Sequence, residues 1–277
     1  VRKGAEERLA DSAREYCDPY ASALVGDCLE RGRDLFQGGA RYHAPWPIGG
    51  FGFGTFIDSL SAIETFVYEK REVSLDELRV ALRNDFAERP DLQVLLRECT
   101  PRFGNDFPEV DDLATEMFDA YANAVHGLND GSLPGTYVTM VFSYNRHVYA
   151  GEVTAATPDG RRARTTFSDA IGPTQGRDRE GPTAMLNSVL KLDMRKMTGA
   201  YALNCKLSPK LLRSAPERRA VKHLFKTYLR GGGVQLQVTC VDADVLRAAQ
   251  VHPEEHANVI VRIAGYCEYF RNLSPEL

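Results

Sequence analysis

Three short stretches carry residue types whose spacing could support chemistry. The first, His252-Pro-Glu-Glu-His256, matches the H-x-x-E-H pattern, in which two histidines hold a zinc ion and a glutamate acts as general base. Pro253 favours a helix that begins after His252, so the two imidazoles lose their fixed helical spacing. No third ligand stands nearby. The stretch is more typical of an exposed helix start with acids in its first turn, and a zinc hydrolase stays as an alternative.

The second stretch is rich in glycine and contains Gly49, Gly50, Gly52 and Gly54. It matches neither G-x-G-x-x-G nor a phosphate loop followed by Lys-Ser/Thr, so a phosphate site is weakly indicated. A backbone that must approach another segment closely is the better interpretation. No spacing marks an acid–base pair among the carboxylates that stand out in the first half, which are Asp58, Glu64, Asp106 and Asp111.

The third stretch, Val261-Arg-Ile-Ala-Gly265-Tyr266, places a glycine directly after an apolar run. Composition alone predicts a buried strand that ends in a turn. Cys267 follows two residues later, and a functional thiol there is an alternative to a structural one. None of the six cysteines forms a CxxC pair, so we expect reduced thiols of a cytoplasmic protein, most of them buried.

Composition limits the classes of protein. Lys+Arg number 34 and Asp+Glu 38, and the net charge of -4 gives no electrostatic argument for a nucleic-acid partner. No run approaches the ~18 consecutive apolar residues of a membrane span, and the first residues lack the apolar core of a signal peptide. Because the sequence does not begin with Met, we expect a piece of a longer protein.

Helices and strands alternate in the second half, which indicates the α/β class. Apolar spacing predicts a helix over 109–128, and capping boxes at Ser74-Leu-Asp-Glu77 and Ser214-Ala-Pro-Glu217 predict two helix starts. Residues 38–54 read as a long loop and residues 1–37 as helical. Strands are expected over 136–144, 201–207, 234–240 and 259–264, and a further helix after His252-Pro253.

The chain resembles the glycyl radical enzymes, the family of pyruvate formate-lyase and related dehydratases and decarboxylases. The family's radical-site motif, R-V-x-G-Y after a helix beginning His-Pro-Glu, is similar to Arg262-Ile-Ala-Gly265-Tyr266 after His252-Pro-Glu. Seven more segments resemble family motifs in the same order: Gly38-Gly-Ala-Arg-Tyr42, Asp58-Ser-Leu-Ser-Ala-Ile63, Phe103-Gly-Asn-Asp106, Thr157-Pro-Asp-Gly-Arg161, Ser168-Asp-Ala-Ile-Gly-Pro-Thr-Gln-Gly176, Gly181-Pro-Thr-Ala184 and Lys191-Leu-Asp193.

The resemblance implies a fold and a chemistry. The fold is the C-terminal half of a ten-stranded α/β barrel with a buried glycyl radical loop: 1–150 would be barrel and 151–277 the glycine radical domain, truncated at its C-terminus. Gly265 would be the catalytic residue and store a carbon radical, which needs a planar centre without a Cβ. A radical-SAM activating enzyme would install the radical, with no bound cofactor and no metal in the chain itself. A homodimer acting on a small-molecule substrate is implied for the full-length protein.

Two departures from the family pattern limit the prediction. The family's thiyl cysteine stands in Gly-Cys-x-Glu, and none of the six cysteines has that context; Cys17 and Cys28 are the nearest lookalikes. The family also continues past Leu277. We therefore expect a fragment truncated at both ends, inactive alone, whose radical passes to an upstream cysteine.

Several functions remain open within this family. The motifs favour a dehydratase-like lyase that cleaves a C–C, C–O or C–N bond in anaerobic metabolism. Formate C-acetyltransferase, arylacetate decarboxylase and fumarate-adding synthase activities are alternatives. A non-catalytic spare radical domain that docks on a damaged partner is another, although the segment 38–63 argues for more than a spare domain.

Overall fold

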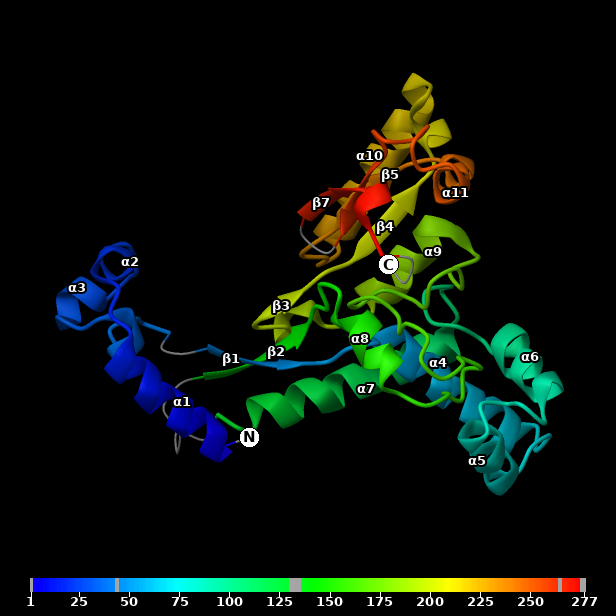
Figure 1. Ribbon diagram of the computed structural model, residues 1–277, viewed down its shortest axis with the longest axis horizontal. Coiled ribbons are helices and arrows are strands. Elements are labelled where there is room, and N and C mark those ends of the chain that lie inside the picture. The colour runs from blue at the N-terminus through cyan, green and yellow to red at the C-terminus, as the bar shows by residue number, and fades with distance from the viewer. Residues whose placement is uncertain (1, 43–44, 130–135, 264–265, 275–277) are drawn as a thin grey trace. The chain divides into compact units, whose positions relative to one another are not determined.

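The computed structural model describes residues 2–42, 45–129, 136–263 and 266–274 (Figure 1). The chain divides into two compact units. The first comprises Val1–Ile48, Ala120–Met140 and Lys196–Gly199, and the second comprises Gly49–Asp119, Val141–Arg195 and Ala200–Leu277. Helices and short strands occur in both units, so the class is mixed α/β, as predicted.

The first unit begins with short helices instead of one continuous helix. Asp18 caps the second of them and Pro19 is its first residue, while left-handed Gly32 ends the third. The elements are α1 (Arg2–Glu15), α2 (Pro19–Leu24), α3 (Cys28–Arg31), η1 (Leu35–Gln37) and β1 (Pro45–Gly49), with β2 (Thr136–Val141) later in the chain.

Strand β1 corrects the prediction of a loop over 38–54. It is the edge strand beside β2, and an edge strand tolerates Pro45 and Pro47 because one side needs no backbone donors. Val125 and Tyr137 are buried beneath this pair, with Trp46 and Ile48 packed against them. The Tyr121 hydroxyl donates to the carbonyl of Ile48 and accepts from the Met140 amide at 3.0 Å.

The second unit contains most of the helices. Ser74 and Glu77 form the predicted capping box, and the buried core of this part includes Phe66, Phe86 and Leu96. The helices, including one π-helical segment, are α4 (Phe53–Ile63), η2 (Glu64–Glu69), α5 (Leu75–Arg83), α6 (Pro90–Cys99), α8 (Arg146–Glu152), α9 (Gly181–Leu190) and η3 (Met194–Lys196), with α7 (Pro108–His126) at the division between the units.

Two pairs of strands organise the last third of the chain (Figure 1). β4 (Asn204–Leu207) pairs in parallel with β5 (Gln237–Cys240), and α10 (Ala215–Arg230) supplies the crossover that a parallel pair requires. β6 (Ile260–Ile263) pairs antiparallel with β7 (Tyr266–Tyr269). The remaining elements here are β3 (Ala200–Tyr201), η4 (Pro209–Leu212), α11 (Ala243–Val251) and η5 (Phe270–Asn272).

Three sequence predictions need correction or remain open. The strand expected over 201–207 is split into β3 and β4, and the described residues 253–259, between His252 and β6, contain no helix. His252 ends α11, because a residue before proline avoids the helical region, and the chain then makes turns until β6. The described strands form small open sheets, so the ten-stranded barrel remains a prediction. No helix in the described part of the chain is long and apolar enough to cross a membrane.

Candidate functional site

The strands β6 and β7 flank the glycine singled out by the sequence. Ile263 pairs with Tyr266 and Arg262 with Cys267, so the strands run alongside each other up to Ile263 and Tyr266. Ala264 and Gly265 lie between these partners in the sequence, but outside the described residues. The structure therefore describes the two strands that lead into and out of Gly265.

A cavity of about 240 Å³ lies against these strands. Val261, Arg262 and Ile263 of β6 form part of its wall. The rest of the lining comes from the motif segment 168–176 and the residues just after it, from α8, α9, β4, α11, β5 and the residue after it, and from the residues after β7: His147, Asp169, Gly172, Pro173, Gln175, Gly176, Asp178, Met185, Asn204, Lys206, Thr239, Val241, Leu246, Phe270 and Leu273. The wall combines apolar side chains with a few convergent polar groups, as ligand pockets do.

One polar cluster in this wall consists of Ser143, His147, Asp169 and Asn204, here called the Asp169 cluster. The Ser143 hydroxyl and the side-chain amide of Asn204 both donate to the Asp169 carboxylate. His147 Nδ1 lies 3.7 Å from Asp169 Oδ1, too far for a hydrogen bond. Burial lowers the pKa of His147, so its imidazole is neutral near pH 7.

The Asp169 cluster is incompletely bonded. His147 Nδ1 and Asn204 Oδ1 are buried, and neither has a hydrogen-bond partner among the described residues. A buried polar atom without a partner is costly, and such atoms are rare in native proteins. Both side chains line the cavity, so its wall includes two residues with an unbonded buried polar atom.

A second cluster holds the motif segment in place from the other side. It consists of Asp58, Arg102, Asp159 and Thr174, here called the Asp58 cluster. Thr174 Oγ1 donates to Asp58 Oδ2 at 2.6 Å, and the Phe103 amide donates to Asp58 Oδ1 at 2.9 Å. Burial raises the pKa of Asp58 to about 6, although the nearby Arg102 guanidinium opposes that shift.

Arg102 completes the Asp58 cluster. Its Nη1 lies 3.4 Å from Asp58 Oδ2 and 3.8 Å from Asp159 Oδ2, and its side chain is 6% exposed. Its Nη2 donates to three backbone carbonyls at 2.7 to 2.8 Å. Its Nε is buried and has no hydrogen-bond partner among the described residues. A buried cation between two carboxylates that also donates to the backbone holds the surrounding segments together.

The glycine-rich stretch does approach another segment closely, as predicted. A Cβ on Gly54 would lie 2.7 Å from the carbonyl oxygen of Gly172 and 2.9 Å from the amide nitrogen of Thr174. The adjacent Thr55 amide donates to Ser168 Oγ at 2.9 Å, and Thr55 Oγ1 accepts from the Ser168 amide at 2.8 Å. The first turn of α4 therefore packs directly on the motif segment that lines the cavity.

The other residues singled out by the sequence lie in ion pairs, at the surface or in turns. Lys191 bridges Asp106 at 3.0 Å and Asp111 at 2.7 Å, a structural ion-pair network, whereas Glu64 is exposed. His252 is the C-cap residue of α11 and His256 lies in the turns that follow, and the described residues contain no group of three potential metal ligands. The zinc alternative has no support in this geometry.

The expectation that most cysteines are buried is wrong. Only Cys28 and Cys205 are buried, while Cys17, Cys99, Cys240 and Cys267 are exposed; all six are free thiols. Burial raises the pKa of Cys205 to about 11, so this thiol stays protonated near neutral pH. Cys267 Sγ lies 3.5 Å from Arg262 Nη1 across the β6–β7 pair.

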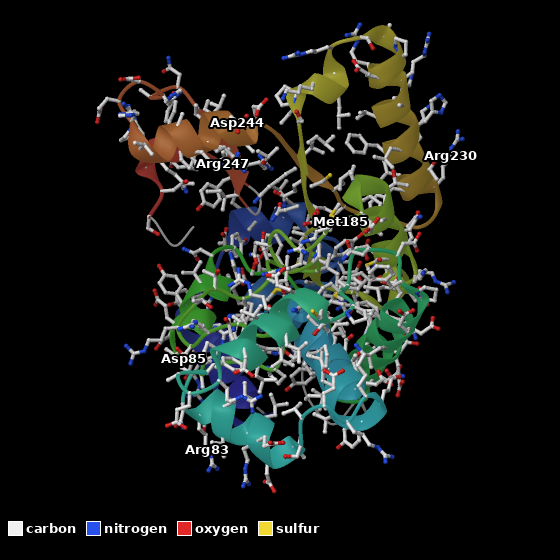
Figure 2. All side chains as sticks on the ribbon, turned by 90° about the vertical axis from the view of Figure 1, so that its right-hand side faces the viewer. Arg83, Asp85, Met185, Arg230, Asp244 and Arg247 are labelled. Carbon is white, nitrogen blue, oxygen red and sulfur yellow. The ribbon has the colours of Figure 1, made fainter. Side chains whose placement is uncertain are left out.

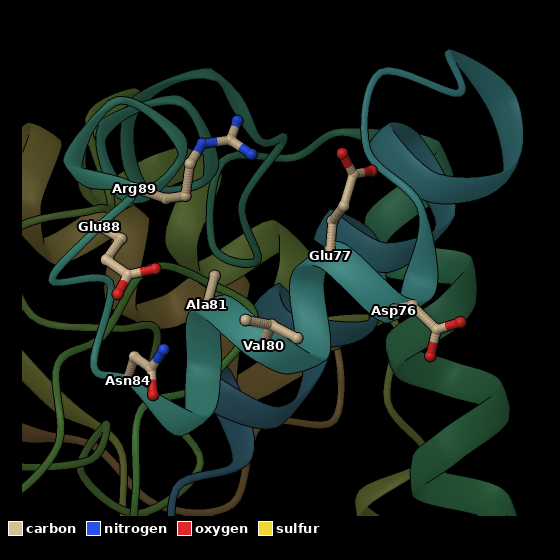
Figure 3. A pocket seen from close by; sticks show the side chains of 7 residues that line it. All are labelled: Asp76, Glu77, Val80, Ala81, Asn84, Glu88 and Arg89. Carbon is tan, nitrogen blue, oxygen red and sulfur yellow. The ribbon is translucent and has the colours of Figure 1, made fainter.

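A surface depression elsewhere, on α5, has no comparable chemistry (Figure 3). Glu77 is engaged in the capping box, Asp76 pairs with Arg79 at 3.0 Å, and Arg89 pairs with Asp91 at 3.0 Å. These contacts engage three of the four charged side chains that line it, and Glu88 is the fourth. The cavity beside β6 is thus the better candidate site.

Sequence reasoning identified the strand before Gly265 and the motif segment containing Asp169, but missed His147, Asn204 and Arg102. His147 stands alone in Tyr144-Asn-Arg-His147, with no neighbouring ligand type to mark it. Asn204 and Arg102 can be recognised as members of these clusters only through partners that are distant in the sequence. No local spacing could have found them.

Comparisons with known proteins agree with the sequence motifs. A family model described as "Pyruvate formate lyase-like" matches residues 11–151, and one described as "Glycine radical" matches residues 167–271. Trans-4-hydroxy-L-proline dehydratase of Clostridioides difficile is 36% identical over 94% of this chain and 32% of its own length. Isethionate sulfite-lyase of Bilophila wadsworthia is 33% identical over 96% of this chain and 32% of its own length.

Solved structures give the same result. Hydroxyproline dehydratase from Clostridioides difficile, with trans-4-hydroxy-L-proline bound, superposes with a TM-score of 0.91 at 34% identity, over 99% of this chain and 34% of that one. The glycerol-bound B12-independent glycerol dehydratase from Clostridium butyricum gives a TM-score of 0.87 at 33% identity, over 97% of this chain and 34% of that one. The chain spans about a third of the length of the curated relatives it matches. With two family models in tandem and these superpositions, the chain belongs to the glycyl radical enzymes, with a pyruvate formate-lyase-like part followed by a glycine radical domain.

Proposed function

We propose that this chain carries the radical store of a glycyl radical lyase and that Gly265 is the residue on which the radical resides. The observation that carries the proposal is the glycine radical match over residues 167–271, which includes Arg262-Ile-Ala-Gly265-Tyr266. The strands on either side of Gly265 pair through Ile263 and Tyr266. Glycine suits this role because an α-carbon radical is most stable when planar and unhindered by a Cβ.

The radical must enter and leave this glycine by hydrogen-atom transfer. A radical-SAM activating enzyme removes one hydrogen atom from the Gly265 α-carbon. The glycyl radical then takes a hydrogen atom from a cysteine thiol, and the resulting thiyl takes one from the substrate. None of the six cysteines stands in Gly-Cys-x-Glu, so the thiyl cysteine lies outside this chain.

The reaction class is inferred from the proteins to which this chain is similar. Dehydratases and sulfite-lyases both remove a leaving group from a small polar substrate, and several are 31 to 36% identical to this chain. This supports a dehydratase-like lyase. Formate C-acetyltransferase, arylacetate decarboxylase and fumarate-adding activities remain alternatives, and the substrate is not assigned. A spare radical domain is less favoured, because residues 11–151 match the pyruvate formate-lyase-like part.

The surroundings of the radical follow from its reactivity. A carbon radical exposed to solvent would react with oxygen, so the Gly265 segment must be enclosed. The proposed enclosure is a ten-stranded barrel, with 1–150 contributing strands and 151–277 contributing the radical domain. The whole enzyme would act as an anaerobic, cytoplasmic homodimer.

Electron paramagnetic resonance (EPR) of the full-length protein, activated without oxygen, tests this proposal. We expect a glycyl doublet, split by the single α-hydrogen that remains on Gly265, which collapses to a singlet when the protein contains [2,2-²H₂]glycine. Gly265→Ala removes the doublet. Gly4→Ala is the matched control, because a Cβ there meets nothing within 4 Å. A doublet that persists in Gly265→Ala would contradict the assignment.

A further inference from the structure

The outer face of α10 is strongly basic. The helix Ala215–Arg230 contains five Lys or Arg residues and a single acidic residue. Arg218, Lys222, Lys226 and Arg230 follow one another at intervals of four, so they form one stripe along the helix, and Arg219 lies beside it. All five side chains are exposed. Figure 2 shows Arg230 at the edge of the molecule, directed away from the other elements.

This stripe has no acidic counterpart within the described chain. Glu217, the helix's one acid, is engaged in the capping box with Ser214. Arg218 Nη1 donates to the carbonyls of Leu212 and Arg213, both at 2.9 Å. Lys222, Lys226 and Arg230 form no ion pair with any described residue. Like charges at this spacing repel one another and weaken a helix, so the stripe is electrostatically uncompensated.

Several other arginines of the second unit are paired. Arg177 and Arg179 share Glu98 at 2.9 and 2.7 Å, and Arg247 pairs with Asp244 at 2.7 Å. The whole chain carries a net charge of -4, so the α10 face contrasts with its surroundings. Concentrated charge of one sign on one face is suited to recruiting a partner of opposite sign.

The character of the helix favours a protein partner. Its apolar side is only partly free: Tyr228 is buried and its hydroxyl donates to the Gln235 carbonyl at 3.3 Å. Leu229 is exposed, and the half-buried apolar residues of the helix are Val221, Leu224 and Phe225. An amphipathic helix that binds a membrane needs its apolar side free. A chain with a net negative charge is also repelled by long polyanions such as nucleic acids. Of these three classes of partner, a protein with an acidic surface therefore fits the basic stripe best.

The position of α10 connects this face to Gly265. The helix joins β4 to β5, and the Thr239 hydroxyl of β5 accepts from the Arg262 amide of β6 at 3.3 Å. Arg262 lies three residues before Gly265. We propose that the basic face of α10, formed by Arg218, Arg219, Lys222, Lys226 and Arg230, is the docking surface for an acidic surface of the activating enzyme. This inference rests on the proposed function, in which that enzyme must reach Gly265.

Charge reversal tests the docking surface. The triple variant Lys222→Glu, Lys226→Glu, Arg230→Glu is compared with a matched control, Arg71→Glu, Arg83→Glu, Arg162→Glu, which makes the same charge change at exposed sites elsewhere. Each full-length protein is incubated with the activating enzyme of the same organism, and the glycyl radical is followed by EPR. At low salt, we expect the glycyl radical to form at least about tenfold more slowly in the α10 variant than in the wild type. The control should stay within about twofold of wild type.

Further measurements separate the outcomes. Wild-type activation should slow as salt rises, and the neutral variant Lys222→Gln, Lys226→Gln, Arg230→Gln should fall between wild type and the reversal. That neutral variant relieves repulsion within the helix, so its effect cannot come from unfolding of α10. Equal activation of wild type and the α10 reversal overturns the docking proposal. Binding of each protein to anionic phosphatidylglycerol vesicles is measured as well. If the reversal weakens only this vesicle binding and leaves activation unchanged, the docking proposal is also overturned. Absence of any glycyl doublet in the wild type instead contradicts the proposed function.

Discussion

The Asp58 and Asp169 clusters both hold the segment 168–176, but they differ in whether their unbonded atoms belong to side chains that line the cavity. In the Asp58 cluster Arg102 Nε has no partner among the described residues, and no member of that cluster lines the cavity. Both oxygens of Asp58 accept hydrogen bonds, and Arg102 stands between Asp58 and Asp159. In the Asp169 cluster, His147 Nδ1 and Asn204 Oδ1 have no partner among the described residues, and both side chains line a cavity. The comparison indicates that one cluster is scaffold and the other belongs to a site.

The difference has an energetic meaning. A buried ion cluster stabilises the fold only while it is intact, because removing one member leaves a buried charge. Unbonded buried atoms in the wall of a cavity carry a cost that is tolerated where a site needs free hydrogen-bonding groups. Removing Arg102 should therefore cost far more stability than removing the unbonded imidazole of His147.

Arg102→Met gives the largest expected effect on the scaffold side. It removes the cation between Asp58 and Asp159 and the donors to three carbonyls. We expect the free energy of unfolding near pH 7.5 to fall by about 3–5 kcal/mol in urea titrations followed by circular dichroism. Arg89→Met, which breaks an exposed pair with Asp91, should cost less than about 1 kcal/mol. Similar losses in both variants would contradict a scaffold role.

The pH dependence of stability sharpens the same point. Burial raises the pKa of Asp58 from 3.8 to about 6, so between these values the folded state binds more protons than the unfolded one. Its stabilising contribution is therefore present at low pH and is lost as pH rises through about 6. Relative to Asp58→Asn, the wild type should lose up to about 3 kcal/mol of unfolding free energy between pH 4 and pH 7.5. A constant difference across that range would show that the Asp58 pKa is not raised.

Gly54→Ala probes the contact between α4 and the segment 168–176. The new Cβ would lie 2.7 Å from the Gly172 oxygen, which is backbone and cannot rotate away. We expect a loss of about 1–3 kcal/mol in chemical denaturation. Gly26→Ala, where a Cβ meets nothing within 4 Å, should stay within about 0.5 kcal/mol of wild type. An equally small effect at Gly54 would mean that the two segments are not in close contact.

His147→Leu gives the smallest expected change and most directly separates the clusters. It replaces a buried imidazole whose Nδ1 is unbonded with an apolar side chain of similar size, so stability should change by less than about 1 kcal/mol. Ser143→Ala removes a bonded donor to Asp169 and should cost about 1–3 kcal/mol. Thermal and urea unfolding of both variants measures this. A loss above about 3 kcal/mol for His147→Leu would make the Asp169 cluster scaffold too.

The elements that local rules determine were predictable. Both capping boxes form as expected, at Ser74 with Glu77 and at Ser214 with Glu217. The apolar spacing over 109–128 becomes α7, and the apolar run before Gly265 becomes β6. Each of these signals lies within a few residues of the structure it specifies.

The clusters could not be predicted, because their partners are distant in sequence. Thr174 and Asp58 are 116 residues apart, and Phe103 and Asp58 are 45 apart. Strand β1 was missed because Pro45 and Pro47 suggest a loop, whereas an edge strand tolerates them. The helix expected after His252 was wrong because the turns from residue 253 leave no room for one before β6 begins at Ile260.

Oxygen cleavage of the activated protein tests the central claim most directly. A carbon radical at Gly265 reacts with oxygen at that α-carbon and breaks the main chain there. Mass spectrometry of the full-length protein, activated and then exposed to air, should find one new break at Gly265 and none in Gly265→Ala. A radical-bearing protein that stays intact in air, or one that breaks at another residue, would contradict the account.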